Sequence, residues 1–596
     1  MNLVSPSTAT LSQQTTVGTA LRHPKARQLL ESELPELRDS AMKMIFAGRP
    51  LGLVLATSPA LEGNPDAIAS LWEKLTMLSP VADELREPEP YVQPDTGYEG
   101  SDVRPGSARA RFVSVVPMYG RFELVLDGPS HGNPFVDVAL MATVDTPSGT
   151  VDVPGFYDEA GIYRLRYLPL EIGEHRFRTS SNARSLDGIE GGFQVSEAEP
   201  GQHGPVRVER TFHFSHADGT RYLPIGTTAY AWTHQGDALE EQTLATLAEA
   251  PFNKIRMCIF PKSYLYNENE PVRYPFVGGI DHGFDLQRFD VSYWRHLEER
   301  IRQLAELGIQ ADIILFHPYD RWGFATMDAA ADDRYLSYAV ARLASFGNVW
   351  WSLANEYDLM PAKSNADWER FASIVRRDDP TNHLLSIHNC FDFYDYSRPW
   401  VTHASVQRRD LYKTAEMTTE WRELWHKPVV IDECAYEGDI DQGWGNITGV
   451  EMVRRFWEGA VRGGYVGHGE TYLRSDEILW WSKGGELRGS SPERIAFLRA
   501  VLEDAPREIE PIAIDWDTPS AGVDGEYYLF YYGFNQPRFR RFLWDPTVAY
   551  TVDIIDTWNM TIERLPGVCR GRFTVDLPAR PYIALRFQAV RTAAVG

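Results

Sequence analysis

The chain has 596 residues, more than one ordinary domain requires, and this length predicts roughly three or four folded units. Hydrophobic residues make up 43% and charged residues 24%, the mean hydropathy is −0.34, and no apolar run reaches the ~18 residues of a membrane helix, so the sequence excludes a membrane-spanning protein. With 59 basic against 83 acidic residues, the net charge of −24 disfavours nucleic-acid binding but leaves neutral ligands such as sugars open.

The first hundred residues predict a helical segment followed by a linker. Residues 1–20 are rich in Ser and Thr without periodicity, which is typical of a disordered or lightly docked terminus. From Lys25 to about Leu78 the pattern is helical, in ARQLLESELPELRDSAMKMIF and DAIASLWEKLTML, with GRPLGLVLATSPALEGNP between them. We expect this segment, residues 1–104 with its linker, to pack on the rest of the chain or to join copies into a homo-oligomer.

A linker rich in Pro and acidic residues, Glu87 to Ser107, precedes a change to strand periodicity. Short runs then alternate apolar and polar residues, separated by Gly, Pro and Asn, over about 90 residues. This spacing predicts an Ig-like β-sandwich at residues 105–200. The runs are RFVSVVP, RFELVLDG, FVDVALMATVD, GTVDVPGFYD, IYRLRYLPL and EHRFRTSS.

Residues 201–506 alternate apolar strand-like runs with amphipathic helices, which predicts a parallel sheet covered by helices. Eight such repeats fit a (β/α)₈ TIM barrel in number and size. Only ten residues separate the fifth and sixth runs, too few for a full helix between them. The eight runs are residues 222–230, 252–260, 308–317, 348–355, 383–389, 400–406, 427–433 and 463–469.

Short strand-like runs return after Pro506 and predict a C-terminal all-β domain at residues 507–596, which we interpret as a stabilising module packed on the barrel. The complete fold prediction is a multidomain α/β protein, with the barrel flanked by the Ig-like sandwich and this C-terminal domain.

The cysteines indicate a reducing compartment. Cys258, Cys390, Cys434 and Cys569 are widely spaced and form no CxxC pair, which argues against a disulfide scaffold or a zinc ribbon. The N-terminus also lacks a basic stretch followed by an apolar one, so the sequence predicts a cytoplasmic protein.

The active site of a (β/α)₈ barrel lies at the carboxyl ends of its strands, and two glutamates stand at such ends. Glu356 follows Asn355 at the end of the fourth run, and Glu433 ends the seventh. Retaining glycoside hydrolysis needs such a pair, one carboxyl to protonate the leaving oxygen and one to attack the anomeric carbon. Because neighbouring side chains on a strand alternate in direction, we choose Glu433 over Asp432 as the residue that faces the mouth. Asn355 can hydrogen-bond a sugar 2-hydroxyl.

Other polar and aromatic side chains near strand ends are candidate substrate contacts. We expect His317 and His403 to hydrogen-bond substrate, and Glu470 to bind hydroxyl groups or raise the pKa of Glu356. Sugars stack their apolar faces on aromatic rings, and the high aromatic content, 12% of the chain, fits either such a platform or a large core. The candidates considered for substrate binding are Arg256, Asn355, His317, His403, Trp232, Tyr436, His468 and Glu470.

Several segments resemble the retaining glycosidases of clan A. WWSLANEYD and KPVVIDECAYEG resemble the clan's fourth- and seventh-strand signatures, which implies Glu356 as acid/base and Glu433 as nucleophile. Arg256 in NKIRMCIF matches the second-strand arginine that orients the nucleophile in this clan.

The domain order resembles the apiosidase-like glycosidases, some of which carry a collagen-binding label. The resemblance covers about residues 105–590 and implies activity on unusual sugars, including furanosides such as apiose or arabinose. It rests on the segments NPFVDVAL, GFYDEAGIYRLRYLPLEIGEHRFRT, RYLPIGTTAYAW, GHGETYL and LWWSKGGELRGSSPERIAFLR.

Other chemistries lack their motifs. No HExxH or closely spaced histidine pair is present, so we expect no metal, although His317, His388, His403 and His468 all fall near strand ends. A GxSxG elbow, a GxGxxG after a strand and a GxxxxGK[ST] loop are also missing, so we expect no serine hydrolase, no nucleotide and no cofactor.

The sequence therefore predicts a retaining glycoside hydrolase whose partner is a carbohydrate, a small glycoside or oligosaccharide. Two alternatives stay open: a carbohydrate- or protein-binding protein whose barrel has lost catalysis, and a transglycosidase with the same catalytic residues.

Overall fold

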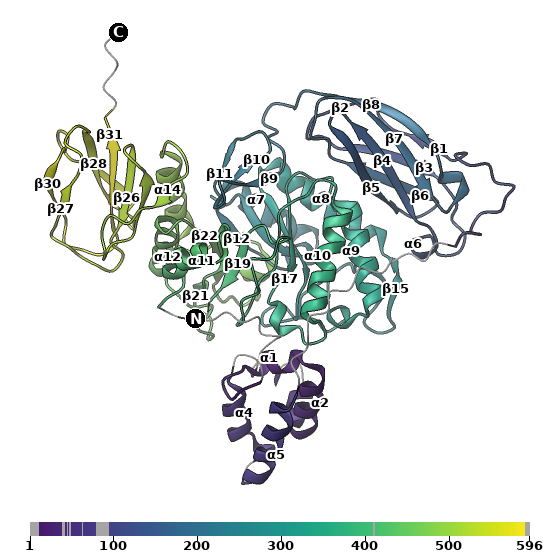
Figure 1. Ribbon diagram of the computed structural model, residues 1–596, viewed down its shortest axis with the longest axis horizontal. Coiled ribbons are helices and arrows are strands. Elements are labelled where there is room, and N and C mark those ends of the chain that lie inside the picture. Colours follow the sequence, from purple (N-terminus) through teal and green to yellow (C-terminus); the bar gives the residue numbers. More distant parts are fainter. Residues whose placement is uncertain are drawn as a thin grey trace.

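The computed structural model describes residues 11–38, 42–43, 46, 49–61, 63–78, 95–408, 410 and 412–590 (Figure 1). Residues 1–10 of the predicted terminus and 79–94, which include the start of the predicted linker, lie outside the described residues. Figure 1 shows a central barrel with a β-unit on one side, a second β-unit on the other, and the N-terminal helices below.

The N-terminal segment is helical, as predicted. Its helices form a local core with Leu30, Leu55 and Leu71 at its centre. The stretch expected to separate two helices is itself partly helical, because LGLVLAT buries Leu51 and Val54 in that core. The elements are α1 (Val17–Arg22), α2 (Pro24–Glu33), η1 (Pro35–Arg38), α4 (Leu51–Thr57), η2 (Pro59–Leu61) and α5 (Pro65–Thr76).

An eight-stranded sheet follows, in the order β1-β3-β6-β5-β4-β7-β8-β2. Its strands pair antiparallel except for β2 with β8, and β4 alternates buried and exposed residues as the sequence pattern predicts. β5 pairs with β4 through residues 149–154 and with β6 through 155–157, so the sheet folds over its own core. The strands are β1 (Arg109–Arg111), β2 (Val115–Pro117), β3 (Phe122–Asp127), β4 (Leu140–Thr146), β5 (Gly149–Tyr157), β6 (Ile162–Tyr167), β7 (Gly173–Ser181) and β8 (Glu190–Ser196).

Eight parallel strands form the central barrel, and each overlaps one of the eight predicted runs. They follow one another around the barrel in chain order, and a parallel bridge between His388 and Ser405 brings the two end strands together, so the sheet is nearly closed. The strands are β12 (Gly226–Thr228), β13 (Lys254–Cys258), β16 (Gln310–Phe316), β17 (Val349–Ala354), β18 (Leu385–Ser386), β19 (Ala404–Gln407), β20 (Val429–Glu433) and β22 (Tyr465–His468).

Helices cover the outside of the barrel, so strands such as β16 and β17 are buried on both faces. A capping box begins α10, in which the Ser364 and Asp367 side chains accept each other's backbone N–H groups. Residues 387–403, all of them described, form no helix, which confirms the short fifth connection. The helices are α7 (Asp237–Glu249), α8 (Val291–Glu306), α9 (Ala329–Leu343), α10 (Asn365–Asp378), α11 (Thr418–Trp425), α12 (Gly449–Val461) and α14 (Pro492–Glu503).

A small antiparallel sheet closes the amino-terminal end of the barrel, and it consists of β9 (Val206–Glu209), β10 (His213–His216) and β11 (Arg221–Tyr222). Phe214 of β10 packs against Trp350 and Tyr465 of the barrel strands. The first predicted run is therefore divided between β11 and β12. This end of the barrel is filled by apolar side chains, which leaves the opposite end for polar chemistry.

The C-terminal region is all-β, as predicted. A six-stranded antiparallel sheet in the order β24-β25-β26-β31-β28-β29 packs with the antiparallel pair β27-β30 around its own core. The strands are β24 (Glu510–Pro511), β25 (Ser520–Val523), β26 (Tyr527–Tyr531), β27 (Phe539–Leu543), β28 (Tyr550–Asp556), β29 (Thr561–Arg564), β30 (Arg572–Asp576) and β31 (Ile583–Ala589).

The N-terminal helices pack beside the carboxyl end of the barrel. The hydroxyl groups of Thr16 and Thr19 both donate to Asp392, in the loop after β18, and α1 contacts the short helix η6 (Tyr357–Leu359) after β17. In the structure this segment therefore contacts the loops that follow β17 and β18.

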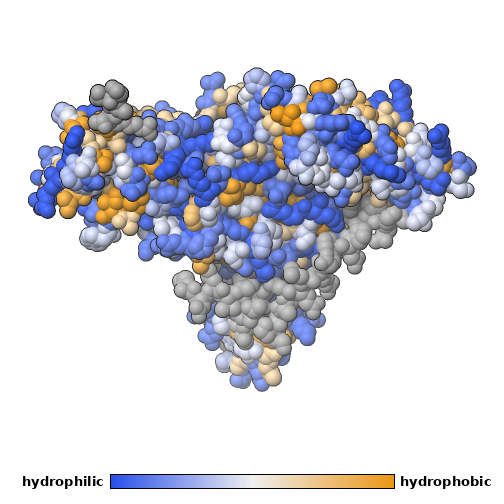
Figure 2. All heavy atoms as spheres, turned by 45° about the horizontal axis from the view of Figure 1, so that its top comes forward, coloured by the Kyte–Doolittle hydropathy of each residue, from blue (hydrophilic) through white to orange (hydrophobic). Residues whose placement is uncertain are grey.

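The face of the molecule drawn in Figure 2 is mostly hydrophilic, with apolar residues in small separate groups among the coloured atoms. Within the described residues, none of the helices combines the length and hydrophobicity that crossing a bilayer requires.

Candidate active site

Four charged side chains fill the middle of the barrel and compensate one another. Lys254 and Arg256 are two residues apart on β13 and point inward, toward Asp312 of β16 and Asp432 of β20. Lys254 Nζ lies 2.6 Å from Asp312 Oδ2 and 2.8 Å from Asp432 Oδ1, and Arg256 Nη1 lies 3.3 Å from an oxygen of each. Burial raises the pKa of Asp432, but the two cations outweigh it and hold that pKa well below its ordinary value.

Asp432 and Glu433 do not alternate as a regular strand predicts. Val406 of β19 pairs with Ile431 and Gln407 pairs with Glu433, so Asp432 is an extra residue on β20 at this irregularity. Both carboxylates therefore contact side chains inside the barrel, Asp432 in the middle and Glu433 at the carboxyl end. Glu433, the residue chosen for the mouth, thus lies there, but it does so through this irregularity and not through regular alternation.

Glu433 is held by groups from other strands. The hydroxyl of Tyr230, which follows β12, donates to Glu433 Oε1, and His388 Nε2 lies 3.6 Å from the same oxygen. Burial and the nearby Arg256 lower the pKa of His388 well below its ordinary value, so its imidazole is neutral.

Glu356 lies just after β17, in a left-handed backbone conformation with φ of 52°. A non-glycine residue rarely adopts this conformation, and such positions concentrate at functional sites. Gln407 of β19 donates to Glu356 Oε1 at 2.7 Å, and the hydroxyl of Tyr319, after β16, donates to Oε2. Both oxygens are thus oriented by neutral donors rather than by a cation.

Glu356 and Glu433 lie close enough to affect each other's charge. Burial, and next the Glu356 carboxylate, raise the pKa of Glu433 to about 7. Near neutral pH, this carboxyl pair therefore holds a proton that an exposed pair would have lost.

Lys262 is a buried cation at the same end of the barrel, and the sequence analysis did not select it. Its ammonium lies over the rings of Tyr230, Tyr319 and Trp481, 3.9, 4.3 and 4.5 Å from their centroids. Burial lowers the pKa of Lys262, while Glu356 and Glu433 are near enough to raise it.

The structure links Arg256 to Glu433, the predicted nucleophile, through other side chains. Its Nη2 donates to Asn355 Oδ1 at 2.9 Å, and Tyr230 bridges Asn355 and Glu433 through its hydroxyl, 3.3 Å from Asn355 Oδ1. The predicted orientation of Glu433 by Arg256 is thus indirect here, through Asn355 and Tyr230.

The two predicted aromatic platforms differ in position. Tyr436 belongs to the mouth, where its hydroxyl lies 3.3 Å from that of Tyr230 and its ring contacts Trp444 and Trp481. Trp232 is completely buried in the main hydrophobic core and offers no face to a sugar. The prediction for Trp232 is wrong, since its position just after a strand does not reveal which way the ring turns.

The structure does not place His317 and His403, the histidines predicted to contact substrate, beside Glu433. His317 Nε2 donates to the Phe260 carbonyl at 3.1 Å, and burial lowers its pKa to about 3. His403 precedes β19 and packs against Phe214 and Trp350 near the amino-terminal end of the barrel. His403 is misplaced in the sequence analysis because the strand begins at Ala404, so this side chain lies at the opposite end from the glutamates.

His468 and Glu470 form a separate group with Glu437, behind Tyr436. Glu470 accepts hydrogen bonds from the backbone N–H groups of Arg488 and Gly489, at 2.5 and 2.7 Å. The structure thus gives Glu470 contacts other than the two glutamates of the mouth.

Sequence reasoning missed the hydroxyl and cation contacts of the glutamates. Tyr230, Gln407 and Lys262 are not among the predicted site residues, and Lys262 lies in a loop that carries no periodic signal. The position of Tyr230, two residues past β12, could have marked it as a strand-end residue.

The arrangement is suited to chemistry at a sugar acetal. Two carboxyls meet at the carboxyl end of a barrel, one with a raised pKa, among hydroxyl donors and aromatic rings. This combination of fold and site is typical of a glycoside hydrolase.

Comparisons with known proteins also indicate a glycoside hydrolase. The family described as "Apiosidase-like, catalytic domain" matches residues 209–500, and two domains of unknown function, DUF5060 and DUF5605, match residues 115–182 and 516–588. A candidate glycoside hydrolase from Bacteroides vulgatus ATCC 8482, known from a crystal structure, is 39% identical over 80% of this chain and 100% of its own, with a TM-score of 0.76. The protein is therefore a glycoside hydrolase, and its barrel matches the apiosidase-like catalytic domain.

A more distant structure shows the fold alone. A family 5 glycoside hydrolase from the same Bacteroides vulgatus strain is 15% identical over 65% of this chain and 94% of its own, with a TM-score of 0.51. No curated protein matches the chain.

Proposed function

We propose that the enzyme is a retaining glycosidase that acts by double displacement, with Glu433 as nucleophile and Glu356 as acid and then base. The observation that carries the proposal is the meeting of these glutamates at the barrel mouth, where burial and Glu356 raise the pKa of Glu433 to about 7. One proton retained by such a pair is the starting state of a double displacement.

In the first step, Glu433 attacks the anomeric carbon while Glu356 gives the proton to the departing oxygen, which leaves a glycosyl-enzyme. In the second, Glu356 takes a proton from water, whose oxygen displaces Glu433 at the same carbon. Tyr230 and Gln407 would orient the two carboxylates, and Asn355 would contact the 2-hydroxyl. Two inversions at one carbon give net retention.

The substrate proposed is a small glycoside or oligosaccharide, with furanosides among the first to test. The family description supports this choice. Transfer to a sugar acceptor in place of water would use the same residues, and product analysis with and without added acceptor separates the two outcomes.

The experiment is a screen of aryl furanosides and pyranosides of both anomers, with proton NMR of the first-formed product. Wild type is compared with Glu356→Gln, Glu433→Gln and the control Glu268→Gln, an exposed glutamate. We expect retention, loss of turnover in the first two variants and normal turnover in the control. Full turnover in both active-site variants, or inversion, would overturn the proposal. Ligand binding by wild type without turnover of any substrate would favour the binding-protein alternative.

Chemical rescue assigns the two roles separately. With a good leaving group such as dinitrophenol, Glu356→Ala should lose little in the first step, since that oxygen needs no proton. Azide should then give a glycosyl azide of retained configuration from Glu356→Ala and of inverted configuration from Glu433→Ala. The reverse pattern would exchange the roles.

The finer assignments of the other regions are also proposals. We propose that residues 1–104, 105–200, 201–506 and 507–596 are separate folding units, and that the second is Ig-like, which its folded-over antiparallel sheet supports. A cytoplasmic location is supported by four cysteines that are all free thiols.

A further inference from the structure

Glu437, His468 and Glu470 form a buried group behind the wall of the barrel mouth. Glu437 and Glu470 are direct register partners of the short parallel strands β21 (Glu437–Gly438) and β23 (Glu470–Thr471). Register partners in adjacent strands point to the same face. A ligand atom from each of the three residues lies within 4.8 Å of the others, and the exposed fractions are 0%, 0% and 2%.

Two carboxylates placed opposite each other in a buried site repel one another and are costly to ionise. Their hydrogen-bond donors are neutral: Tyr472, Ser490 and Ser491 donate to Glu437, and backbone N–H groups donate to Glu470. Among the described residues, neither glutamate forms an ion pair with a lysine or arginine. The side chain of Arg488, whose backbone binds Glu470, pairs instead with Glu486.

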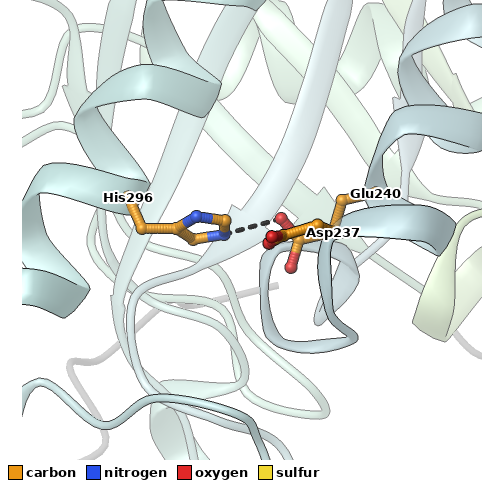
Figure 3. A group of neighbouring side chains, drawn as sticks. All are labelled: Asp237, Glu240 and His296. Atoms are coloured by element: carbon orange, nitrogen blue, oxygen red, sulfur yellow. Dashed lines mark hydrogen bonds and ion pairs between the residues drawn. The ribbon is translucent and has the colours of Figure 1, made fainter.

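A second group of two carboxylates and one histidine shows how buried negative charge is usually compensated. In Figure 3, His296 Nε2 points toward Glu240 Oε2 at 2.6 Å, with Asp237 beside them. Glu240 also accepts from Arg300 Nε at 2.7 Å, and the Asp237 side chain is 69% exposed. Here a protein cation and solvent compensate the charge, so this group needs no metal ion.

The orientation of His468 indicates that the group of Glu437, His468 and Glu470 binds a ligand. Its Nδ1 lies 3.0 Å from Thr227 Oγ1, which also accepts from Trp480 Nε1 at 2.8 Å. Its Nε2 is completely buried, has no hydrogen-bond partner among the described residues, and lies 4.0 Å from Glu470 Oε2. With Nδ1–H donated to Thr227, Nε2 presents a lone pair to the carboxylates, which is how a metal-binding histidine is commonly oriented.

We propose that Glu437, His468 and Glu470 bind a divalent transition-metal ion, with Zn²⁺ and Mn²⁺ as the first probes. One imidazole nitrogen with two carboxylate oxygens suits such ions better than Ca²⁺ or Mg²⁺, which prefer oxygen ligands alone. The ion would supply the positive charge that side chains supply at Glu240.

The role of this ion is structural. Tyr436 precedes Glu437, and a Cβ at Gly469 would lie 2.3 Å from its ring, so the paired strands press directly on that ring. Tyr436 in turn contacts Tyr230, the donor to Glu433. An ion that joins β21 and β23 would hold this wall of the mouth in place without touching the substrate.

The test is metal content and thermal stability of the full chain. Protein freed of metal by chelation is loaded with Zn²⁺ or Mn²⁺, passed over a desalting column and analysed by mass spectrometry for metal. We expect one ion per chain and a higher Tm than in the metal-free protein. In His468→Gln and Glu470→Gln the ion should be lost, and in His296→Gln, the matched variant of the Figure 3 group, it should be kept.

Three results would overturn the proposal: no retained ion in wild type, a Tm that neither metal nor chelator changes, or full metal content in His468→Gln. A proton on Glu470 is the competing explanation, since burial raises the pKa of that carboxyl to about 7. A proton in place of the ion predicts that wild type retains no metal and that neither metal nor chelator changes the Tm. If the variants fail to fold, Co²⁺ titration of wild type decides, since nitrogen and oxygen ligands give visible absorption bands and an unfilled site gives none.

Discussion

Carboxylates are buried both in the middle and at the mouth of the barrel, but the groups that contact them differ: cations in the middle and neutral hydrogen-bond donors at the mouth. In the middle, Asp432 and Asp312 share two cations within 3.3 Å. At the mouth, Glu433 and Glu356 are held by hydroxyl and amide donors, and the buried cation Lys262 lies over aromatic rings. Asp432 and Glu433 are adjacent in sequence, yet their pKa values move in opposite directions. Burial alone therefore does not mark a catalytic carboxyl, and in this barrel the carboxyls at the mouth differ from those in the middle by having no ion pair with a lysine or arginine among the described residues.

The largest expected effect is on activity, in Glu433→Gln. Removal of the nucleophile should lower kcat/KM by about 10⁴-fold or more, since residues that act as a unit in covalent catalysis cost this much when removed. Circular dichroism should show a normal fold, because an amide fits the same hydrogen bonds. Turnover within tenfold of wild type would mean that the mouth carboxyl is not the nucleophile.

Asp432→Asn should do the opposite and damage the fold. It leaves Lys254 and Arg256 with a single buried partner, Asp312, and breaking a buried ion pair typically costs about 3–5 kcal/mol. Urea unfolding measures the loss. Ser405→Ala is the control, since it removes a neutral hydroxyl that donates to Asp432 and contacts Arg256 and His388 but leaves every charge in place, and it should cost about 1–2 kcal/mol. Equal effects in the two variants would contradict the charge argument.

The barrel was predictable from sequence because its strands are buried on both faces and so appear as apolar runs. The strand ends that carry Glu356 and Glu433 followed directly. Side-chain direction did not follow: the irregularity at Asp432 depends on pairing with β19, and the burial of Trp232 depends on packing by distant residues. Partners from loops, such as Lys262, leave no periodic pattern in the sequence at all.

The raised pKa of Glu433 also predicts how stability depends on pH. In the folded protein the coupled pair of Glu433 and Glu356 keeps one proton up to about pH 7, while in the unfolded chain a glutamate loses its proton near 4.5. The folded state binds more protons between these values, so the free energy of unfolding should fall as pH rises from 4.5 to 7, by on the order of 3 kcal/mol. Urea unfolding at pH 5 and pH 8 should show this fall in wild type and a smaller one in Glu433→Gln. The same fall in both proteins would assign it to other groups.

Lys262→Met should shift the pH dependence of activity without abolishing it. The ammonium lowers the pKa at which the coupled pair of Glu433 and Glu356 loses its proton, so its removal should raise that pKa and move the basic limb of kcat/KM to higher pH, by roughly one unit or less. Lys262→Arg keeps the charge and should keep the wild-type limb. A limb that does not move in Lys262→Met would mean that this cation does not act on the pair.

The smallest expected effect concerns the N-terminal helices, which pack beside the mouth through Thr16 and Thr19 on Asp392. Thr19→Val removes one of these hydrogen bonds and should loosen the contact by about 1 kcal/mol. Hydrogen exchange should speed up in α1 and in residues 385–392 and stay unchanged in β16, within the barrel.

Because α1 contacts η6, directly after Glu356, the same variant should alter KM for oligosaccharides more than for aryl glycosides if these helices border the substrate. Faster exchange with equal KM for both substrates would give the helices a purely structural role, and unchanged exchange would mean that these hydrogen bonds do not hold them in place.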